Sequence, residues 1–254
     1  MKNIWTIAKN TLKLETRDKI WIALVAFGLG YIAIMLFLSD LVLKELPMVK
    51  AFALLGIYFF NVVIALFLGT TSFYRDVERK TVYFILAKPV SRAQFLLGKF
   101  FGLCLVIFFT SVALAAAYLF VVASAGGGFD AMGLLAIFMQ FLEMSLFIAF
   151  AIFVSTFSSS LLSIIYTSAI FFLGHVVSQL LEDARKIGIT GIRYIFVNIL
   201  YYIFPNLEKF NIRDFAVHGV ATPWVSLGFA LAYAAAYIIL LLFVAIWIFE
   251  KKEI

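Results

Sequence analysis

The side chains with the clearest capacity for chemistry lie inside long apolar stretches. Glu143 is the only acidic residue well inside such a stretch, and Gln140 precedes it by about one helical turn. An intramembrane carboxylate costs at least ~2.5 kcal/mol and therefore usually marks a function. Glu143 could line a substrate or proton path, or it could hold two helices together through a hydrogen bond. We favour helix packing because the apolar stretches offer no basic partner, and we interpret Asn61 in the same way.

Thioether, thiol and imidazole groups could in principle form a path for a soft metal such as copper. No two of these groups occur at a ligand spacing such as M-x-x-x-M or C-x-x-C. We therefore expect no metal site, and we expect the histidines to serve in helix packing and in a loop. The residues considered are Cys104, Met139, Met144, His175 and His218.

Residues 75–96 combine charge, an apolar run and a helix stop within a short distance. A charged start is followed by the apolar stretch Val82–Ala87 and then by Pro89, which ends a helix. Ser91 can cap a new helix, with Gln94 three positions later as in a capping box. A short helix in this position would lie across the ends of two membrane spans. A soluble partner that binds it could move both spans together.

The elements that must position these residues are membrane-spanning helices. Phe100–Phe129 contains thirty residues without Asp, Glu, Lys or Arg, and 65% of the chain is hydrophobic. About 20 apolar residues cross a hydrocarbon core of ~30 Å as a helix. The sequence therefore predicts an all-α polytopic protein with a single domain over 1–254. Its six predicted spans are about 20–38, 51–73, 100–123, 133–155, 160–181 and 224–249.

Three further segments complete the predicted organisation. Residues 2–19 place apolar side chains on one helical face and Lys9, Lys13 and Arg17 on another, which is typical of a helix in the membrane interface. The alternative is a simple positively charged anchor. Residues 182–222 form a long loop that could cover an outer vestibule or bind an extracytoplasmic partner protein. Within it, the apolar stretch 194–204 is too short to cross and is expected to be interfacial or re-entrant.

Orientation follows from the distribution of basic residues, which are enriched on the cytoplasmic side of a membrane. Thirteen Lys and Arg lie on one side of the predicted spans and seven on the other, five of those seven in the long loop. Both termini are therefore predicted to be cytoplasmic, with 182–222 outside. The net charge of +6 comes from these loops, so we expect contacts with membrane lipid and no nucleic-acid partner.

The runs Arg75-Asp-Val-Glu-Arg-Lys-Thr, Leu86-Ala-Lys-Pro-Val-Ser-Arg and Leu97-Gly-Lys together resemble the permease subunits of ABC-2 type exporters. The segment 204–210 is also similar to the branch that includes permeases of multicopper-enzyme maturation. The resemblance implies an N-terminal elbow helix, a cytoplasmic coupling helix at 75–96, and a location in the cytoplasmic membrane. It further implies that two copies of the permease, expected to be a homodimer, work with two ABC ATP-binding subunits. The implied docking residues are Arg75, Asp76, Glu78, Arg79, Phe84, Ile85 and Pro89.

The sequence also limits the alternatives. It contains no G-x-x-x-x-G-K-[ST] motif, so no cofactor is expected in this chain, and ATP and magnesium would belong to the partner ATPase. A secondary transporter or channel subunit would more often show inverted repeats and paired intramembrane charges, which the sequence does not reveal. An intramembrane enzyme needs at least two positioned catalytic groups, and Glu143 alone does not make such a site.

Overall fold

The computed structural model describes residues 2–41, 45–78, 90–188 and 190–251, and every regular element in these ranges is a helix. Six of the helices are long and apolar enough to cross a membrane, which confirms the predicted fold class and number of spans. These helices are α2 (Lys19–Leu41), α3 (Leu46–Glu78), α5 (Arg92–Ser124), α6 (Ala131–Ser155), α7 (Ser160–Lys186) and α10 (Trp224–Lys251).

Four shorter elements complete the described structure. An N-terminal helix precedes the first span, and three short elements lie between α7 and α10. Residues 79–89, which make up half of the predicted coupling helix at 75–96, lie outside the described residues. The short elements are α1 (Lys2–Glu15), α8 (Ile192–Ile203), the 3₁₀ helix η1 (Leu207–Phe210) and α9 (Arg213–His218).

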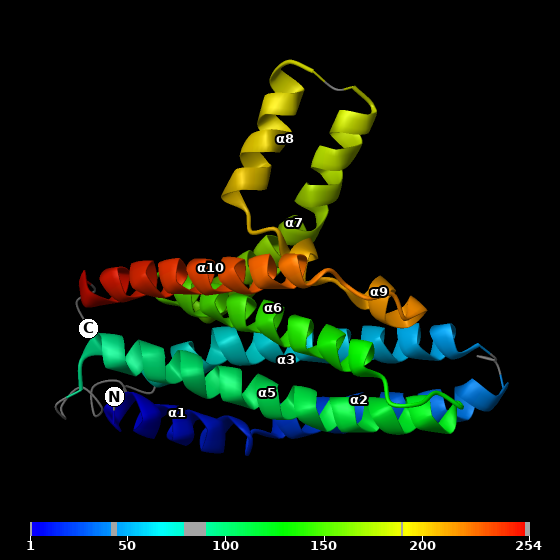
Figure 1. Ribbon diagram of the computed structural model, residues 1–254. Helices are drawn as coiled ribbons and strands as arrows, with labels where there is room; N and C mark the ends of the chain where they lie inside the picture. The colour runs from blue at the N-terminus through cyan, green and yellow to red at the C-terminus, as the bar shows by residue number, and fades with distance from the viewer. Residues whose placement is uncertain (1, 42–44, 79–89, 189, 252–254) are drawn as a thin grey trace.

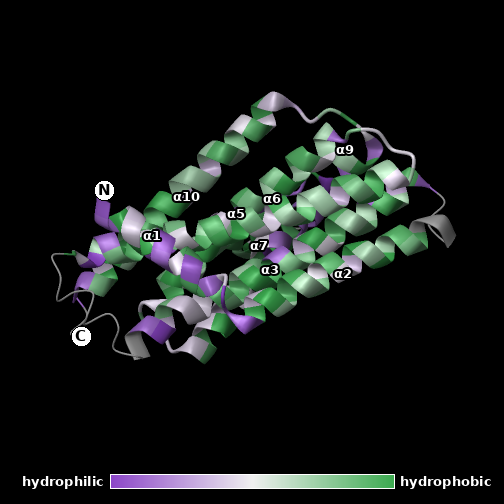
Figure 2. Cartoon of the chain, turned by 90° about the horizontal axis from the view of Figure 1, so that it is seen from below, coloured by the Kyte–Doolittle hydropathy of each residue, from purple (hydrophilic) through white to green (hydrophobic). Residues whose placement is uncertain are grey.

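The long helices form a bundle with two distinct ends (Figure 1). Both chain termini lie at one end, here called the terminal end, whereas α9 and the α5–α6 connection lie at the opposite end. Hydrophilic residues gather near the termini and around α9, and the helices between them are largely hydrophobic (Figure 2). A bundle with this distribution fits a bilayer, since each helix satisfies its own backbone hydrogen bonds in the apolar region.

Helix α6 is the centre of the bundle. It contacts α3, α5, α7, α9 and α10, and most of its side chains are buried. Small residues bring α3 close to it: a Cβ atom on Gly69 would lie 2.7 Å from the Cβ of Ala151. Small residues at such crossings allow the helix backbones to approach closely, which favours packing where lipid removes the hydrophobic driving force.

The ends of the helices follow local sequence signals. The predicted capping box is confirmed, since the Ser91 side chain accepts from the Gln94 N–H while the Gln94 side chain accepts from the Ser91 N–H. The turn between α6 and α7 falls in the hydroxyl-rich stretch 156–159, where side chains hydrogen-bond to backbone carbonyls and compete with the helix.

The C-terminal half of α7 and helix α8 form a hairpin that stands out from the other helices (Figure 1). Most of its large apolar side chains are exposed, with Ile192 at 83% and Tyr202 at 73%. The stretch 194–204, predicted to be interfacial or re-entrant, forms most of helix α8. The polar tip of the hairpin carries several charged residues, including Glu182, Arg185 and Lys186.

Candidate functional site

Glu143 lies in a hydrogen-bonded cluster formed by three helices. Tyr58 of α3 donates its hydroxyl hydrogen to Oε1 of Glu143 at 2.7 Å, and Nε2 of His175 in α7 lies 3.2 Å from the same oxygen. The Glu143 side chain is only 1% exposed. The expectation that Glu143 lacks a basic partner is therefore wrong. The basic partner is His175 of α7, 32 positions later in the chain. The two side chains come together only because α7 packs against α6.

The hydrogen bonds of this cluster fix the number of protons that it holds. Nδ1 of His175 lies 3.1 Å from the carbonyl oxygen of Phe171, so Nδ1 must carry a hydrogen. Nε2 lies 2.9 Å from the Tyr58 hydroxyl, whose single hydrogen can serve either Nε2 or Glu143. Complete hydrogen bonding therefore requires one further proton shared by Glu143 and His175. The pair then has no net charge, which suits its position within the spans.

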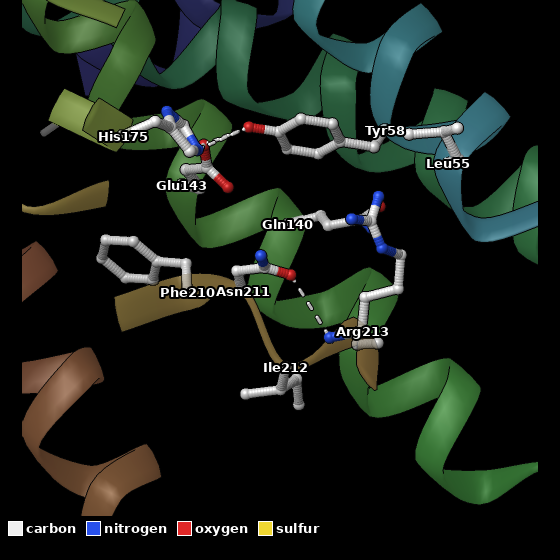
Figure 3. Close-up of a pocket in the computed structure, with 10 residues that line it drawn as sticks. Leu55, Tyr58, Gln140, Glu143, His175, Phe210, Asn211, Ile212 and Arg213 are labelled. Carbon is white, nitrogen blue, oxygen red and sulfur yellow. Dashed lines mark hydrogen bonds and ion pairs between the residues drawn. The ribbon is translucent and has the colours of Figure 1, made fainter. Parts of the chain in front are cut away.

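A cavity of about 210 Å³ adjoins this cluster. Its wall comes from α3, α6 and α7, and the segment 210–213 at the start of α9 closes it (Figure 3). Gln140 lies on the cavity wall one turn from Glu143, as the sequence predicted from their spacing. The side chain of Arg213 extends toward Gln140 from the other side of the cavity. The long loop, for which the sequence left open a cover over an outer vestibule or a partner-binding surface, thus contributes residues to the cavity.

Asn61 lies apart from this cavity. Its Nδ2 donates to Oγ of Ser111 at 3.1 Å, which links α3 to α5 inside the bundle. This contact agrees with the helix-packing interpretation, and neither residue lines the cavity. In the part of the chain that the structure describes, no three His, Cys, Asp or Glu side chains gather in a way that could hold a metal ion.

A second polar site lies at the terminal end of the bundle, where α1 and α3 meet. Arg75 near the end of α3 forms ion pairs with Glu15 at the end of α1 and with Asp18, both at 2.5 Å. Glu15 is also the acceptor for the hydroxyl of Ser72, at 2.6 Å. These contacts hold the N-terminal helix against α3 through charge-assisted hydrogen bonds, which are stronger than neutral ones.

The same network extends to α5 through a buried lysine. Lys99 is 4% exposed, donates to the Ser72 hydroxyl at 3.2 Å and forms an ion pair with Asp76. Lys99 therefore joins α5 to the last turns of α3. These two helices are the ones that the segment 79–91 connects. We call the five charged residues of this site the terminal-end network: Glu15, Asp18, Arg75, Asp76 and Lys99.

The structure places only part of the predicted docking surface. Arg75 and Asp76 are partly exposed and form ion pairs with other residues of the chain, in the terminal-end network. Arg79, Phe84, Ile85 and Pro89 lie outside the described residues, as does the side chain of Glu78. Sequence analysis did not identify Glu15 or Lys99 as partners of the segment. For Lys99 a signal was present, because it directly precedes the charge-free run 100–129 and would need a partner if buried there.

Lys50, Tyr118 and Asp130 form a polar cluster at the end opposite the termini. Asp130 caps α6 by accepting from the Gly133 N–H, and it also accepts from Tyr118 at 2.6 Å and Lys50 at 3.0 Å. Burial opposes ionisation of this carboxyl, but these hydrogen bonds and the Lys50 charge outweigh it and hold the pKa of Asp130 below its usual range. The cluster fixes the connection between α5 and α6 and leaves no free group for chemistry.

Comparison with known proteins identifies the family. Residues 5–254 match the family described as ABC-2 family transporter protein, so the match covers nearly the whole chain. A search of curated proteins found no match. The family match agrees with the six apolar helices and with the resemblance carried by residues 75–99. It does not distinguish the branch that the segment 204–210 suggested. The chain therefore belongs to the ABC-2 transporter family, as a multi-pass membrane permease component of an ABC export system.

Proposed function

We propose that this permease works in the cytoplasmic membrane with both termini in the cytoplasm, and that a separate ATPase drives it through residues 75–96. Two copies of the ATPase, one for each of two permeases, would supply the ATP and magnesium sites. Contact with the ATPase would use Glu78 and Arg79, the apolar residues Phe84 and Ile85, and the turn at Pro89. Arg75 and Asp76, at the charged start of the segment, would border this surface.

The terminal-end network is the observation that supports this proposal. It joins α1, the end of α3 and the start of α5 through ion pairs in which Glu15 and Lys99 are the buried members. A force on the segment between α3 and α5 would then move three helices together, because separating them would leave the buried Glu15 and Lys99 without their charged partners. Since Arg75 and Asp76 already have partners inside the protein, we assign them mainly to transmission of the force and the residues after them to contact with the ATPase.

Co-purification with the partner ATPase, to be sought among the products of neighbouring genes, tests the docking. Phe84→Asp combined with Ile85→Asp should remove the apolar anchors that supply most interface affinity, so ATPase recovery should fall at least about tenfold. Phe84→Leu with Ile85→Leu keeps the apolar character and serves as the matched control. Glu78→Lys should cause a smaller loss that depends on salt concentration. Equal ATPase recovery with the Asp and Leu variants would show that this segment is not the docking site.

We also propose that two permease copies assemble into a homodimer. The exposed apolar surface of the α7–α8 hairpin supports this, because a second copy could cover it within the membrane. Light scattering of the detergent-solubilised permease should give a protein mass of two chains, after correction for bound detergent. A protein mass of one chain, at concentrations where the ATPase complex is intact, would exclude the homodimer.

One observation favours a second candidate function. Glu143 and His175 form a polar pair inside the spans, and such pairs occur in proton-coupled secondary transporters. Transport assays in vesicles separate the two functions. An ATP-driven exporter should stop when the ATPase is removed and continue when a protonophore collapses the proton gradient. The reverse result would support proton-coupled transport.

A further inference from the structure

The cavity beside Glu143 contains polar groups without a partner. Gln140 is only 5% exposed, and its Oε1 is fully buried and accepts no hydrogen bond. Its Nε2 makes one long contact, 3.5 Å from the carbonyl oxygen of Leu54. Buried polar atoms are nearly always hydrogen-bonded, so an unpaired acceptor on a cavity wall indicates a donor that binds there.

A second unpartnered group faces the same space. Among the described residues, the guanidinium of Arg213 takes part in no ion pair or side-chain hydrogen bond, since only its backbone N–H has a bond, to Asn211. Figure 3 shows this side chain reaching from the start of α9 toward Gln140. A guanidinium offers planar donors that suit carboxylate and phosphate oxygens. The lining of the cavity thus contains one unpaired donor group and one unpaired acceptor group.

The charges of the wall decide the sign of that occupant. Glu143 and His175 together carry no net charge when their hydrogen bonds are complete, so Arg213 leaves the lining with one positive charge. Glu208 lies nearby but outside the lining, where it accepts from the Asn211 side chain at 2.7 Å. A monoanion would neutralise Arg213. The volume has room for about seven water molecules at ~30 Å³ each, which limits the ligand to a small molecule.

We propose that the cavity between Gln140, Glu143 and Arg213 binds a small organic monoanion that also carries a hydrogen-bond donor, as a hydroxy acid does. The anionic group would bind to Arg213, and the donor would bind to Oε1 of Gln140. That this ligand is the exported substrate rests on the proposed function, but its binding does not. The experiment therefore uses the purified permease without its ATPase.

Four probes of similar size separate the contributions to binding. Lactate has both groups, propionate lacks the hydroxyl, propane-1,2-diol lacks the carboxylate, and alanine has an ammonium group in place of the hydroxyl. Calorimetric titration at matched ionic strength should rank lactate first. Propionate should bind about fivefold more weakly, because one hydrogen bond is missing. The diol should show no measurable binding.

Variants assign these preferences to residues. Arg213→Gln should weaken lactate binding about tenfold or more, and Gln140→Leu should make lactate and propionate equal. Glu208→Gln removes a negative charge outside the lining, so it should strengthen lactate binding and serves as the matched control. The thermal midpoint of each variant without ligand shows whether it is folded, and the ranking of the probes in the unsubstituted protein requires no variant.

Three results would overturn the proposal. Equal binding of lactate and propionate to the unsubstituted protein would remove the role of Gln140. Tighter binding of alanine than of lactate would show that the cavity prefers a zwitterion of zero net charge to a monoanion. Absence of binding by every carboxylate would exclude an anion site. None of these results bears on whether an ATPase docks at residues 75–96.

Discussion

Glu143, His175 and Tyr58 act as one hydrogen-bonded unit, so the effect of changing one residue depends on the other two. Glu143→Gln keeps a side chain of the same shape that can both donate and accept, and it removes the ionisable group. His175→Ala instead leaves the buried carboxylate with only Tyr58 as a partner. The two substitutions therefore differ in what they leave unsatisfied inside the membrane.

We expect His175→Ala to lower the free energy of unfolding by about 3–5 kcal/mol, because it leaves a buried carboxylate without its basic partner. Glu143→Gln should cost only about 1 kcal/mol and leave transport near normal. In the double variant the neutral amide should recover much of the loss caused by His175→Ala alone. Unfolding of the permease in detergent measures these differences, with the exposed His218→Ala as a control.

A result in which Glu143→Gln abolishes transport while the protein remains folded and assembled would contradict the packing role. It would place Glu143 on the path of substrate or protons. An additive loss in the double variant would show that the two side chains do not interact.

At the scale of elements, the attachment of α1 to α5 depends on two glycines. Gly98 and Gly102 lie one turn apart on α5, and a Cβ atom on either would come within 2.6 Å of a Cβ atom on α1, of Ile7 or Thr11. The helices therefore touch along their backbones, and the terminal-end network can form only at this distance. Glycine is required here by the close approach and not by a special backbone conformation.

We expect Gly98→Leu to displace α1, with a cost of about 1–3 kcal/mol for the forced overpacking. Ala8 is fully buried in the α1–α5 contact, so a cysteine at this position reports the displacement. In a Cys104→Ser background, Ala8→Cys should react slowly with a thiol reagent alone and rapidly when combined with Gly98→Leu. Gly30→Leu is the matched control, because a Cβ atom on Gly30 meets nothing within 4 Å.

Rapid labelling of Ala8→Cys in the presence of glycine at position 98 would mean that α1 is not held against α5. Slow labelling in the Gly98→Leu variant would mean that α1 tolerates the larger side chain without moving.

For the whole molecule, the two ends of the bundle should face opposite sides of the membrane. Lys251 is exposed at the end where both termini lie, and Phe129 is 78% exposed in the α5–α6 connection at the other end. In the Cys104→Ser background, Phe129→Cys should react with an impermeant thiol reagent added outside intact cells. Lys251→Cys should react only after the membrane is opened. Labelling of both positions from the same side would exclude the six-span topology.

The sequence by itself determined the class and organisation of the protein. Charge-free stretches long enough to cross a bilayer predict helices, because no other single segment satisfies its own backbone in lipid. The number of spans, the Ser91 capping box and the family resemblance follow from such local patterns. The helix at 192–203 and the extension of α3 to Glu78 were less predictable, since short apolar and mixed stretches leave their length to packing.

The tertiary structure alone decided which polar residues meet. Glu143 pairs with His175 and Tyr58, and Arg75 pairs with Glu15 and Asp18, across 32 to 85 positions of the chain. Helical periodicity shows which face of one helix a residue occupies, but not which neighbouring helix lies against that face. In lipid that choice depends on close backbone contacts at small residues and on buried hydrogen bonds. Both arise only when the whole bundle is packed.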